Sequence, residues 1–233
     1  MSGSAEGMAQ VEIMALTRED LLGNPPAALP GLRDLRPGWR IHLDDVFVLF
    51  ADLRKSSLLT YQLGNDTMDQ LLDDFRRLSA SVIADCGGKM YDFPGDGILA
   101  VFTSSAGPLS LFAAAERIIE AVDDIAMLIR DEVASITPIA VGIGLDRGPI
   151  LARRSFHGET DKISLTGDCA NVAAALAKSV QPPNFTVATV DCCAALDNIP
   201  EDWWSETVNV GTVQRHVRVT GPRPYSQILA AIR

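Results

Sequence analysis

The order of apolar segments between residues 46 and 145 limits the fold of this chain more than any other feature. Residues 46–51 form an apolar run rich in β-branched and aromatic side chains, which is typical of a buried strand. Helical spacing and strand-like runs alternate after it, and Gly64 is expected to divide the first helical region. The predicted elements are strand 46–51, two helices within 57–85, a hairpin of strands 89–93 and 97–102, helix 108–132 and strand 138–145. This β-α-β-β-α-β order predicts an α+β, ferredoxin-like fold, with helices packed on one face of a mainly antiparallel sheet.

The segments outside this core are less regular. Glycine, proline and charged residues interrupt residues 1–44, which we expect to be an N-terminal extension with a short helix within 12–22. Residues 45–233 are expected to form the compact domain. After the core we expect a turn at Gly148-Pro149, strand 150–153, an exposed polar segment 154–161, helix 168–180, strand 185–188, a helix near 190–196 and a strand pair around 207–220.

Charge and cysteine usage exclude some functional classes. The chain has 30 acidic and 20 basic side chains, and its formal charge of −10 argues against a nucleic-acid-binding surface. No apolar stretch approaches the ~20 residues of a membrane span, and the N-terminus carries no visible secretory signal. The four cysteines lack metal-ligand spacing, which favours free thiols in a reducing compartment. We therefore expect a cytoplasmic protein that binds neither nucleic acid nor membrane.

Two aspartates stand where predicted strands end. Asp52 closes the run 46–51, and Asp96 lies in the tight turn 94–97 of the predicted hairpin. Two carboxylates at the ends of neighbouring strands can hold a pair of divalent cations. Mg²⁺ and Mn²⁺ prefer such oxygen ligands, and a two-metal site can clamp the attacking and leaving oxygens of a phosphoryl transfer.

Four motifs together resemble the catalytic domain of class III nucleotidyl cyclases. Residues 49–54 (LFADLR) resemble the first-strand motif, and residues 87–89 (GGK) with 95–102 (GDGILAVF) resemble the metal-binding hairpin. The central strand and turn correspond to residues 141–149, and the late helix to 166–174 (TGDCANVAA). The motifs occur in family order and cover about residues 45–180, so their combination is far more specific than any one of them.

The resemblance implies a two-metal reaction at a dimer interface. Such enzymes are head-to-tail homodimers that convert a nucleoside triphosphate to a 3′,5′-cyclic nucleotide and pyrophosphate. Carried over by motif, Asp52, Asp96 and the carbonyl of Leu53 are the ligands of two divalent cations, Mn²⁺ or Mg²⁺. Metal A would lower the pKa of the ribose 3′-hydroxyl, and metal B would hold the triphosphate.

The resemblance also assigns residues to the substrate. The loop after the first strand would face the triphosphate, with Arg54, Ser56 and Ser57 as substrate-binding residues at the start of a helix. Asn171 matches the catalytic asparagine that orients the ribose. The partner subunit would supply it, together with the residues that recognise the base.

Several positions depart from the family pattern. Adenylate cyclases carry a lysine four residues before the second metal aspartate, where this chain has Asp92. Ser164 replaces the usual aspartate or threonine that reads the base. The arginine expected one helical turn after Asn171 is Ala175, and Lys178, one turn further on, is a candidate for the missing positive charge.

These departures bear on the choice of base. Adenine N1 is an acceptor, whereas an ionised Asp92 can only accept a hydrogen bond, so Asp92 favours a base with an N–H at that edge. Uracil N3–H and guanine N1–H both qualify, which predicts that ATP is a poor substrate. Because little else accompanies the cyclase-like segment, the chain also resembles the stand-alone pyrimidine cyclases of Pycsar anti-phage systems. We therefore expect UTP and a cUMP product in antiviral defence, with GTP or CTP as alternatives.

Two less specific interpretations remain open. Asp92 is a solvated strand residue if Tyr91 and Phe93 are the inward-facing pair. The absence of arginine at Ala175 is also compatible with a degenerate cyclase that acts as a nucleotide-binding or dimerisation module. Incubation with Mn²⁺ and each of the four nucleoside triphosphates separates an enzyme from such a module.

Overall fold

The computed structural model describes residues 29–31, 35–36, 38–92, 95–130, 137–157, 160–179, 184–196 and 203–220. Its strands are β1 (Arg40–Leu53), β2 (Lys89–Asp92), β3 (Gly97–Thr103), β4 (Val141–His157), β5 (Thr160–Thr166), β6 (Phe185–Thr189), β7 (Trp204–Val210) and β8 (Val213–Thr220). Its helices are α2 (Ser56–Leu63), α3 (Asn65–Asp85), α4 (Gly107–Arg130), α5 (Asp168–Ser179) and α6 (Val190–Cys193). None of the helices described is both long and apolar enough to cross a membrane.

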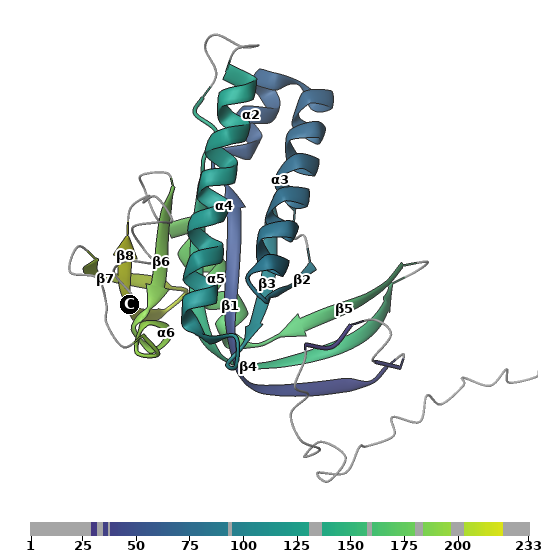
Figure 1. The fold of residues 1–233 in the computed structure, drawn as a ribbon, viewed down its shortest axis with the longest axis vertical. Coiled ribbons are helices and arrows are strands. Elements are labelled where there is room, and N and C mark those ends of the chain that lie inside the picture. The colour runs from purple at the N-terminus through teal and green to yellow at the C-terminus, as the bar shows by residue number, and fades with distance from the viewer. Residues whose placement is uncertain are drawn as a thin grey trace, which may run out of the picture.

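One sheet contains all of these strands (Figure 1). Its order is β2-β3-β1-β4-β6-β8-β7, and β5 pairs with β4 outside this path. The first four strands are antiparallel neighbours in the order of a ferredoxin-like core, and β4 and β6 are parallel. The predicted α+β fold with a mainly antiparallel sheet is confirmed.

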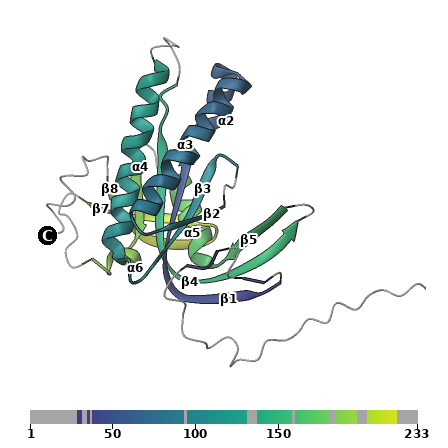
Figure 2. The ribbon, with the colours of Figure 1, turned by 45° about the vertical axis from the view of Figure 1, so that its right-hand side comes forward.

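Helices α3 and α4 cover one face of this sheet (Figure 2). Alternate side chains of β1, among them Phe47 and Leu49, pack there against α3 and α4 in the largest apolar core. Gly64, with a φ of 79°, separates α2 from α3 as the sequence predicted, because a residue with a side chain rarely adopts this backbone conformation. The helices of the ferredoxin-like core therefore lie together, as expected.

The opposite face of the sheet carries α5. The other set of β1 side chains, Val46, Val48 and Phe50, packs there against Ala173 and Ala177. Glycines make this contact close: a Cβ added at Gly144 would lie 2.0 Å from the carbonyl oxygen of Ala173. The backbone of α5 therefore rests almost directly on the backbone of β4.

The structure corrects the sequence prediction for residues 148–161. The Gly148-Pro149 pair is no turn, because β4 runs without a break from Val141 to His157 and pairs with β5 at its far end. The register between β1 and β4 shifts between Leu43 and Val46, so the proline stands opposite a bulge. At a bulge its missing N–H breaks no ladder hydrogen bond. Likewise, the predicted polar segment 154–161 is mostly strand.

Other boundaries also differ. β1 begins at Arg40, before the predicted domain start at residue 45, because Arg40 pairs with Arg153 of β4. The division into 1–44 and 45–233 stays a prediction, and the predicted helix within 12–22 lies outside the described residues. The predicted helix near 190–196 is shorter, Val190–Cys193.

Candidate functional site

The structure brings Asp52 and Asp96 together. Asp52 is the penultimate residue of β1 and pairs with Gly97, so Asp96, the residue before it, arrives beside Asp52. The Asp52 side chain shares the α5 face with Phe50, because side chains alternate along a strand. Asp52 is 9% exposed, and its Oδ1 has no hydrogen-bond partner among the described residues.

The electrostatics of Asp52 follow from this position. Burial raises its pKa most, and the negative charge of Asp96 and a hydrogen-bonding contact with that carboxyl raise it further. The positive charges of Lys178 and Arg54 act in the opposite direction. Two acidic groups thus share a partly desolvated space that two cationic side chains border.

This arrangement fits a divalent cation. The buried, unpartnered Oδ1 of Asp52 and the adjacent Asp96 carboxyl are hard oxygen donors of the kind that Mg²⁺ and Mn²⁺ prefer. The described residues include no cluster of three or more histidine, cysteine or acidic side chains around a common point. The predicted further ligand is the backbone carbonyl of Leu53, and water or a substrate can add oxygen atoms.

Arg54 lies on the same side of the site. Its Nη1 donates to the carbonyl oxygen of Lys178 at 3.2 Å, while its Nε and Nη2 are buried without a partner among the described residues. Burial lowers the pKa of the guanidinium. Gly142 leaves room for this side chain, because an added Cβ would lie 2.2 Å from Nη2. The structure therefore holds Arg54 between β4 and the end of α5.

Ser56 and Ser57 form the first turn of α2. Lys55, at the N-cap, adopts a φ of 55°, and its carbonyl accepts from the amides of Leu58 and Leu59. No side chain caps this end of α2, and its first turn carries no acidic residue. An uncapped helix N-terminus is a suitable environment for an anion, which agrees with the predicted role of this loop.

Lys178 and Asn171 both lie on α5, about two helical turns apart. The charge of Lys178 acts on Asp52, and its Nζ lies 5.9 Å from the centre of the Phe50 ring. Asn171 is exposed and lies about 10 Å further along α5, at a rise of ~1.5 Å per residue. Ala175, half-buried, lies between them. The structure therefore brings Lys178, but not Asn171, to the aspartates of the same chain.

Asp92 and Ser164, the predicted base-recognition residues, lie on two strands that contact each other, β2 and β5. Asp92 ends β2, and Ser164 lies in β5 opposite Arg153 of β4. The Nζ of Lys162, also in β5, lies 3.5 Å from Oδ2 of Asp92. Sequence reasoning missed Lys162, although it stands two residues before Ser164 and so shares its side of the strand.

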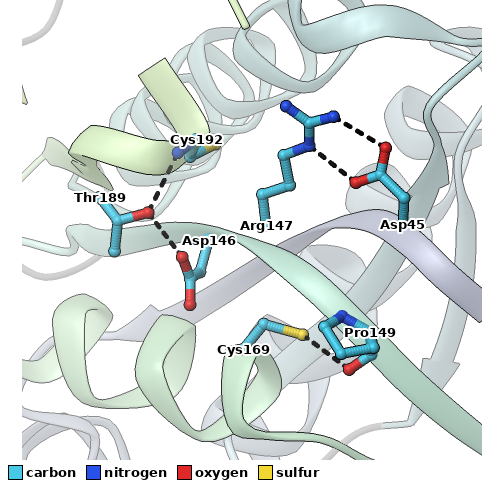
Figure 3. Close-up of polar contacts among 7 residues, drawn as sticks. All are labelled: Asp45, Asp146, Arg147, Pro149, Cys169, Thr189 and Cys192. Carbon is cyan, nitrogen blue, oxygen red and sulfur yellow. Dashed lines mark hydrogen bonds and ion pairs between the residues drawn. The ribbon is translucent and has the colours of Figure 1, made fainter. Parts of the chain in front are cut away.

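A second polar cluster lies between β4 and the two C-terminal helices (Figure 3). Thr189 donates to Oδ1 of the buried Asp146 at 2.5 Å and accepts from the amide of Cys192 at 3.2 Å. Burial raises the pKa of Asp146, and the Thr189 hydrogen bond opposes this. The thiol of Cys169 donates to the Pro149 carbonyl at 3.5 Å, and burial raises its pKa to about 11. These groups fix α5 and α6 to β4. All four cysteines are free, as predicted.

Comparisons with known proteins find similar structures but no similar sequence family. No protein-family model and no curated protein matches the sequence. Solved structures do match: the adenylyl cyclase CyaB from P. aeruginosa has a TM-score of 0.67 at 13% identity, with 79% of this chain and 97% of that chain covered. The fold is that of a nucleotidyl cyclase catalytic domain.

Two guanylyl cyclases support the same assignment of the fold. Cya2 has a TM-score of 0.67 at 18% identity, covering 81% of this chain and 96% of that chain. The non-canonical dimeric guanylyl cyclase domain of the RhoGC fusion protein from the aquatic fungus Blastocladiella emersonii has a TM-score of 0.61 at 16% identity. That match covers 78% of this chain and 99% of the fungal domain. The nucleotidyl cyclase fold thus extends over most of the described chain, at sequence identities that leave substrate and site residues open.

Proposed function

We propose that this protein is a nucleotidyl cyclase that converts a nucleoside triphosphate, preferably UTP, to a 3′,5′-cyclic nucleotide and pyrophosphate. The observation that carries the proposal is the pair Asp52 and Asp96 on a cyclase fold. Their carboxyl groups meet, and the buried Oδ1 of Asp52 has no partner among the described residues. A buried carboxylate oxygen without a partner is costly to the fold, which favours a ligand that completes it.

Asp52, Asp96 and the carbonyl of Leu53 would hold two divalent cations, Mn²⁺ or Mg²⁺. Bound there, the ions supply activation of the ribose 3′-hydroxyl and neutralise charge on the triphosphate. The residues of this chain then position the substrate. Arg54 and Lys178 bring two positive charges to the aspartates, and the uncapped start of α2, at Ser56 and Ser57, offers backbone N–H groups to phosphate oxygens.

The proposal includes a homodimer. Asn171 is exposed and distant along α5 from the aspartates of its own chain, which supports a role toward the partner subunit. The similar fungal domain is a non-canonical dimer, which supports association of this fold but does not give the arrangement of the two subunits. In the dimer, Asn171 would orient the ribose over the partner's metal site. Lys178 acts instead beside Asp52 of its own chain, so it does not stand in for the arginine that is absent at Ala175.

Asp92 carries the proposal for the base. As an ionised carboxylate it accepts from a ring N–H, such as uracil N3–H or guanine N1–H, and gives adenine N1 no donor. We therefore propose UTP as the substrate and cUMP as the product, with GTP as the alternative that also offers a ring N–H. CTP, the other alternative from the sequence, offers no ring N–H to Asp92. A role in anti-phage signalling stays a prediction from the sequence.

A four-nucleotide assay tests the proposal. Purified protein is incubated with Mn²⁺ and each nucleoside triphosphate, and cyclic products are identified by mass spectrometry. We expect cUMP from UTP, and a loss of at least ~10³-fold in Asp52→Asn and in Asp96→Asn, because the variants lose a charged oxygen ligand. Thermal melts of both variants establish that they are folded. Unchanged turnover in either variant contradicts the metal assignment.

The same assay separates the alternative of a degenerate cyclase, which Ala175 favours because the chain lacks a transition-state donor there. Mn²⁺-dependent nucleotide binding without any cyclic product would support a binding or dimerisation module in place of an enzyme.

A further inference from the structure

The second half of β4, residues 151–157, and β5 form a two-stranded arm that contacts β2. β5 pairs with the far end of β4, yet it also contacts β2, which lies at the other edge of the ferredoxin-like core. A small apolar cluster joins the two: Ile163 of β5 is buried with Leu35, and Tyr91 of β2 packs against them. Tyr91 also donates to the carbonyl of Pro30 at 2.8 Å. These contacts fix β5 and β2 relative to each other within one chain.

A bulge in β2 directs Asp92 toward this junction. Met90 pairs with Ala100, but Asp92 pairs with Leu99, so Tyr91 is an extra residue in the strand. Cross-strand partners share a face of the sheet, and Leu99 packs on the α5 face. Asp92 therefore points to the face that carries Asp52. Bulges of this kind re-aim side chains and are common beside active sites.

Lys162 meets Asp92 at this junction. Its Nζ lies 3.5 Å from the Asp92 Oδ2, and the two side chains are 42% and 38% exposed. An ion pair at this distance and exposure contributes little to stability. Two half-exposed groups of fixed hydrogen-bonding polarity, held by strands that are distant in sequence, suit recognition of a ligand better than stabilisation of the fold.

We propose that Lys162 is a specificity-determining residue that reads the nucleobase together with Asp92. The inference rests on the proposed function. An ammonium only donates and a carboxylate only accepts, so the pair complements a ring N–H beside a carbonyl. With Asp92 on the ring N–H, Lys162 donates to O4 of uracil or O6 of guanine. Adenine and cytosine present an acceptor and then an amino group in the same order, so the pair rejects them.

Substitution of Lys162 tests its role. Lys162→Met should lower kcat/KM for the preferred triphosphate about 10-fold to 100-fold, mainly through KM, because a hydrogen bond from a charged donor is lost. Lys162→Arg keeps a donor and should retain the base preference. Arg77→Met is the matched control, because Arg77 forms an ion pair with Asp74 on α3, remote from the base. The inference is overturned if Lys162→Met has the same nucleotide profile as Arg77→Met.

Exchange of the two charges is the sharper test. The double variant Asp92→Lys with Lys162→Asp reverses the polarity of the pair while it keeps both groups. Preference should move from UTP or GTP toward ATP or CTP, whereas either single exchange should weaken every base. A double variant that is folded and retains the wild-type preference would overturn the inference. Thermal melts report whether each variant is folded.

The inference and the proposed function can fail separately. Displacement of a fluorescent nucleotide by each triphosphate, in the presence of Ca²⁺, measures base preference without turnover. If the wild type forms no cyclic product but Lys162→Met changes the order of displacement, the cyclase proposal fails and the base-reading pair stands. If no triphosphate displaces the probe differently in wild type and Lys162→Met, the base-reading pair is overturned.

Discussion

The two faces of the sheet are built differently. Beneath α3 and α4, large apolar side chains such as Phe47, Phe75 and Phe102 interlock in the largest core of the chain. Beneath α5 the contacts are made by small residues, with Gly144 of β4 against the backbone of Ala173. Asp52, Asp92 and Asp146 belong to the α5 face, whereas the helical face buries almost entirely apolar side chains.

This difference separates stability from chemistry. Side chains that interlock tolerate some repacking, whereas a helix that rests on the backbone of a strand has little freedom to shift. Lys178 and Asn171 lie on such a helix, so their positions depend on the glycines of β4. Substitutions on the helical face should lower stability without changing nucleotide selectivity, whereas substitutions on the α5 face should also change activity.

The largest expected effect on stability comes from the helical face. Leu71 of α3 is 1% exposed, and Leu71→Ala should cost about 2–5 kcal/mol of unfolding free energy through lost burial and the cavity that remains. Leu128 of α4 is 75% exposed, so Leu128→Ala is a matched control and should change stability by no more than ~0.5 kcal/mol. Denaturant titration measures both.

The same two variants test whether the helical face affects nucleotide preference. Where each is folded, its order of preference among the four triphosphates should equal that of the wild type. A changed preference in Leu71→Ala would show that the helical face also shapes the substrate site.

Gly144→Ala should have the next largest effect. The added Cβ would lie 2.0 Å from the carbonyl of Ala173 and 2.6 Å from the amide of Ala177, so backbone must move. We expect a loss of about 1–3 kcal/mol or more, and a fall in kcat as α5 moves away from β4. Gly148→Ala is the control, since its Cβ would lie 3.3 Å from the Cβ of Cys169, where a shift of a few tenths of an ångström suffices.

The readout of these two variants is a thermal melt with a turnover assay. If Gly144→Ala has the melting temperature and kcat of the wild type, the close contact between α5 and β4 determines neither stability nor turnover.

The sequence predicted the ferredoxin-like core because its signals are local. The hairpin turn, the break at Gly64 and the apolar run before Asp52 each act within a few residues. The continuous β4 was missed because Gly148-Pro149 is locally a turn signal, and the bulge that tolerates the proline lies in β1, about 100 residues earlier. Long-range pairing decides such cases.

The candidate site shows the same limit. The meeting of Asp52 and Asp96 followed from adjacent strands, so the sequence could predict it. The approach of Lys162 to Asp92 depends on an arm of β4 and β5 that the sequence presented as an exposed polar segment. Asp146 was missed because its partner, Thr189, lies in a distant strand and gives no pattern of its own.

The buried Asp146 on the α5 face is expected to make the stability of the protein depend on pH. Its pKa is raised above 3.8 in the folded protein, chiefly by burial, so folding favours the protonated form. Its contribution to stability is therefore full below about pH 3.8 and is lost as pH rises through the higher pKa of the folded state. Asp146→Asn keeps an acceptor for Thr189 and has no charge to bury. We expect this variant to be more stable than wild type at pH 7.

Denaturant titrations of both proteins across pH test this. The gap between Asp146→Asn and wild type should close as the pH falls to about 3.8. A gap that is constant with pH would mean that Asp146 does not titrate differently in the folded and unfolded states.

The smallest expected effect comes from Arg147, which follows Asp146 in β4 and lies on the opposite face of the sheet. Arg147 donates from Nε and Nη2 to Asp45 at 2.7 and 2.8 Å and lies 5.2 Å from the Phe47 ring centre, but the pair is 35% and 44% exposed. A double-mutant cycle of Arg147→Met with Asp45→Asn should give a coupling of ~1 kcal/mol or less, reduced further in 1 M salt.

The hydrogen bond from Arg147 lowers the pKa of Asp45, so this coupling is present at pH 7 and is lost as the pH falls through that lowered value. Asp146 and the Asp45–Arg147 pair should thus respond to pH with opposite signs, and a coupling that grows on acidification would contradict an ion pair between Asp45 and Arg147.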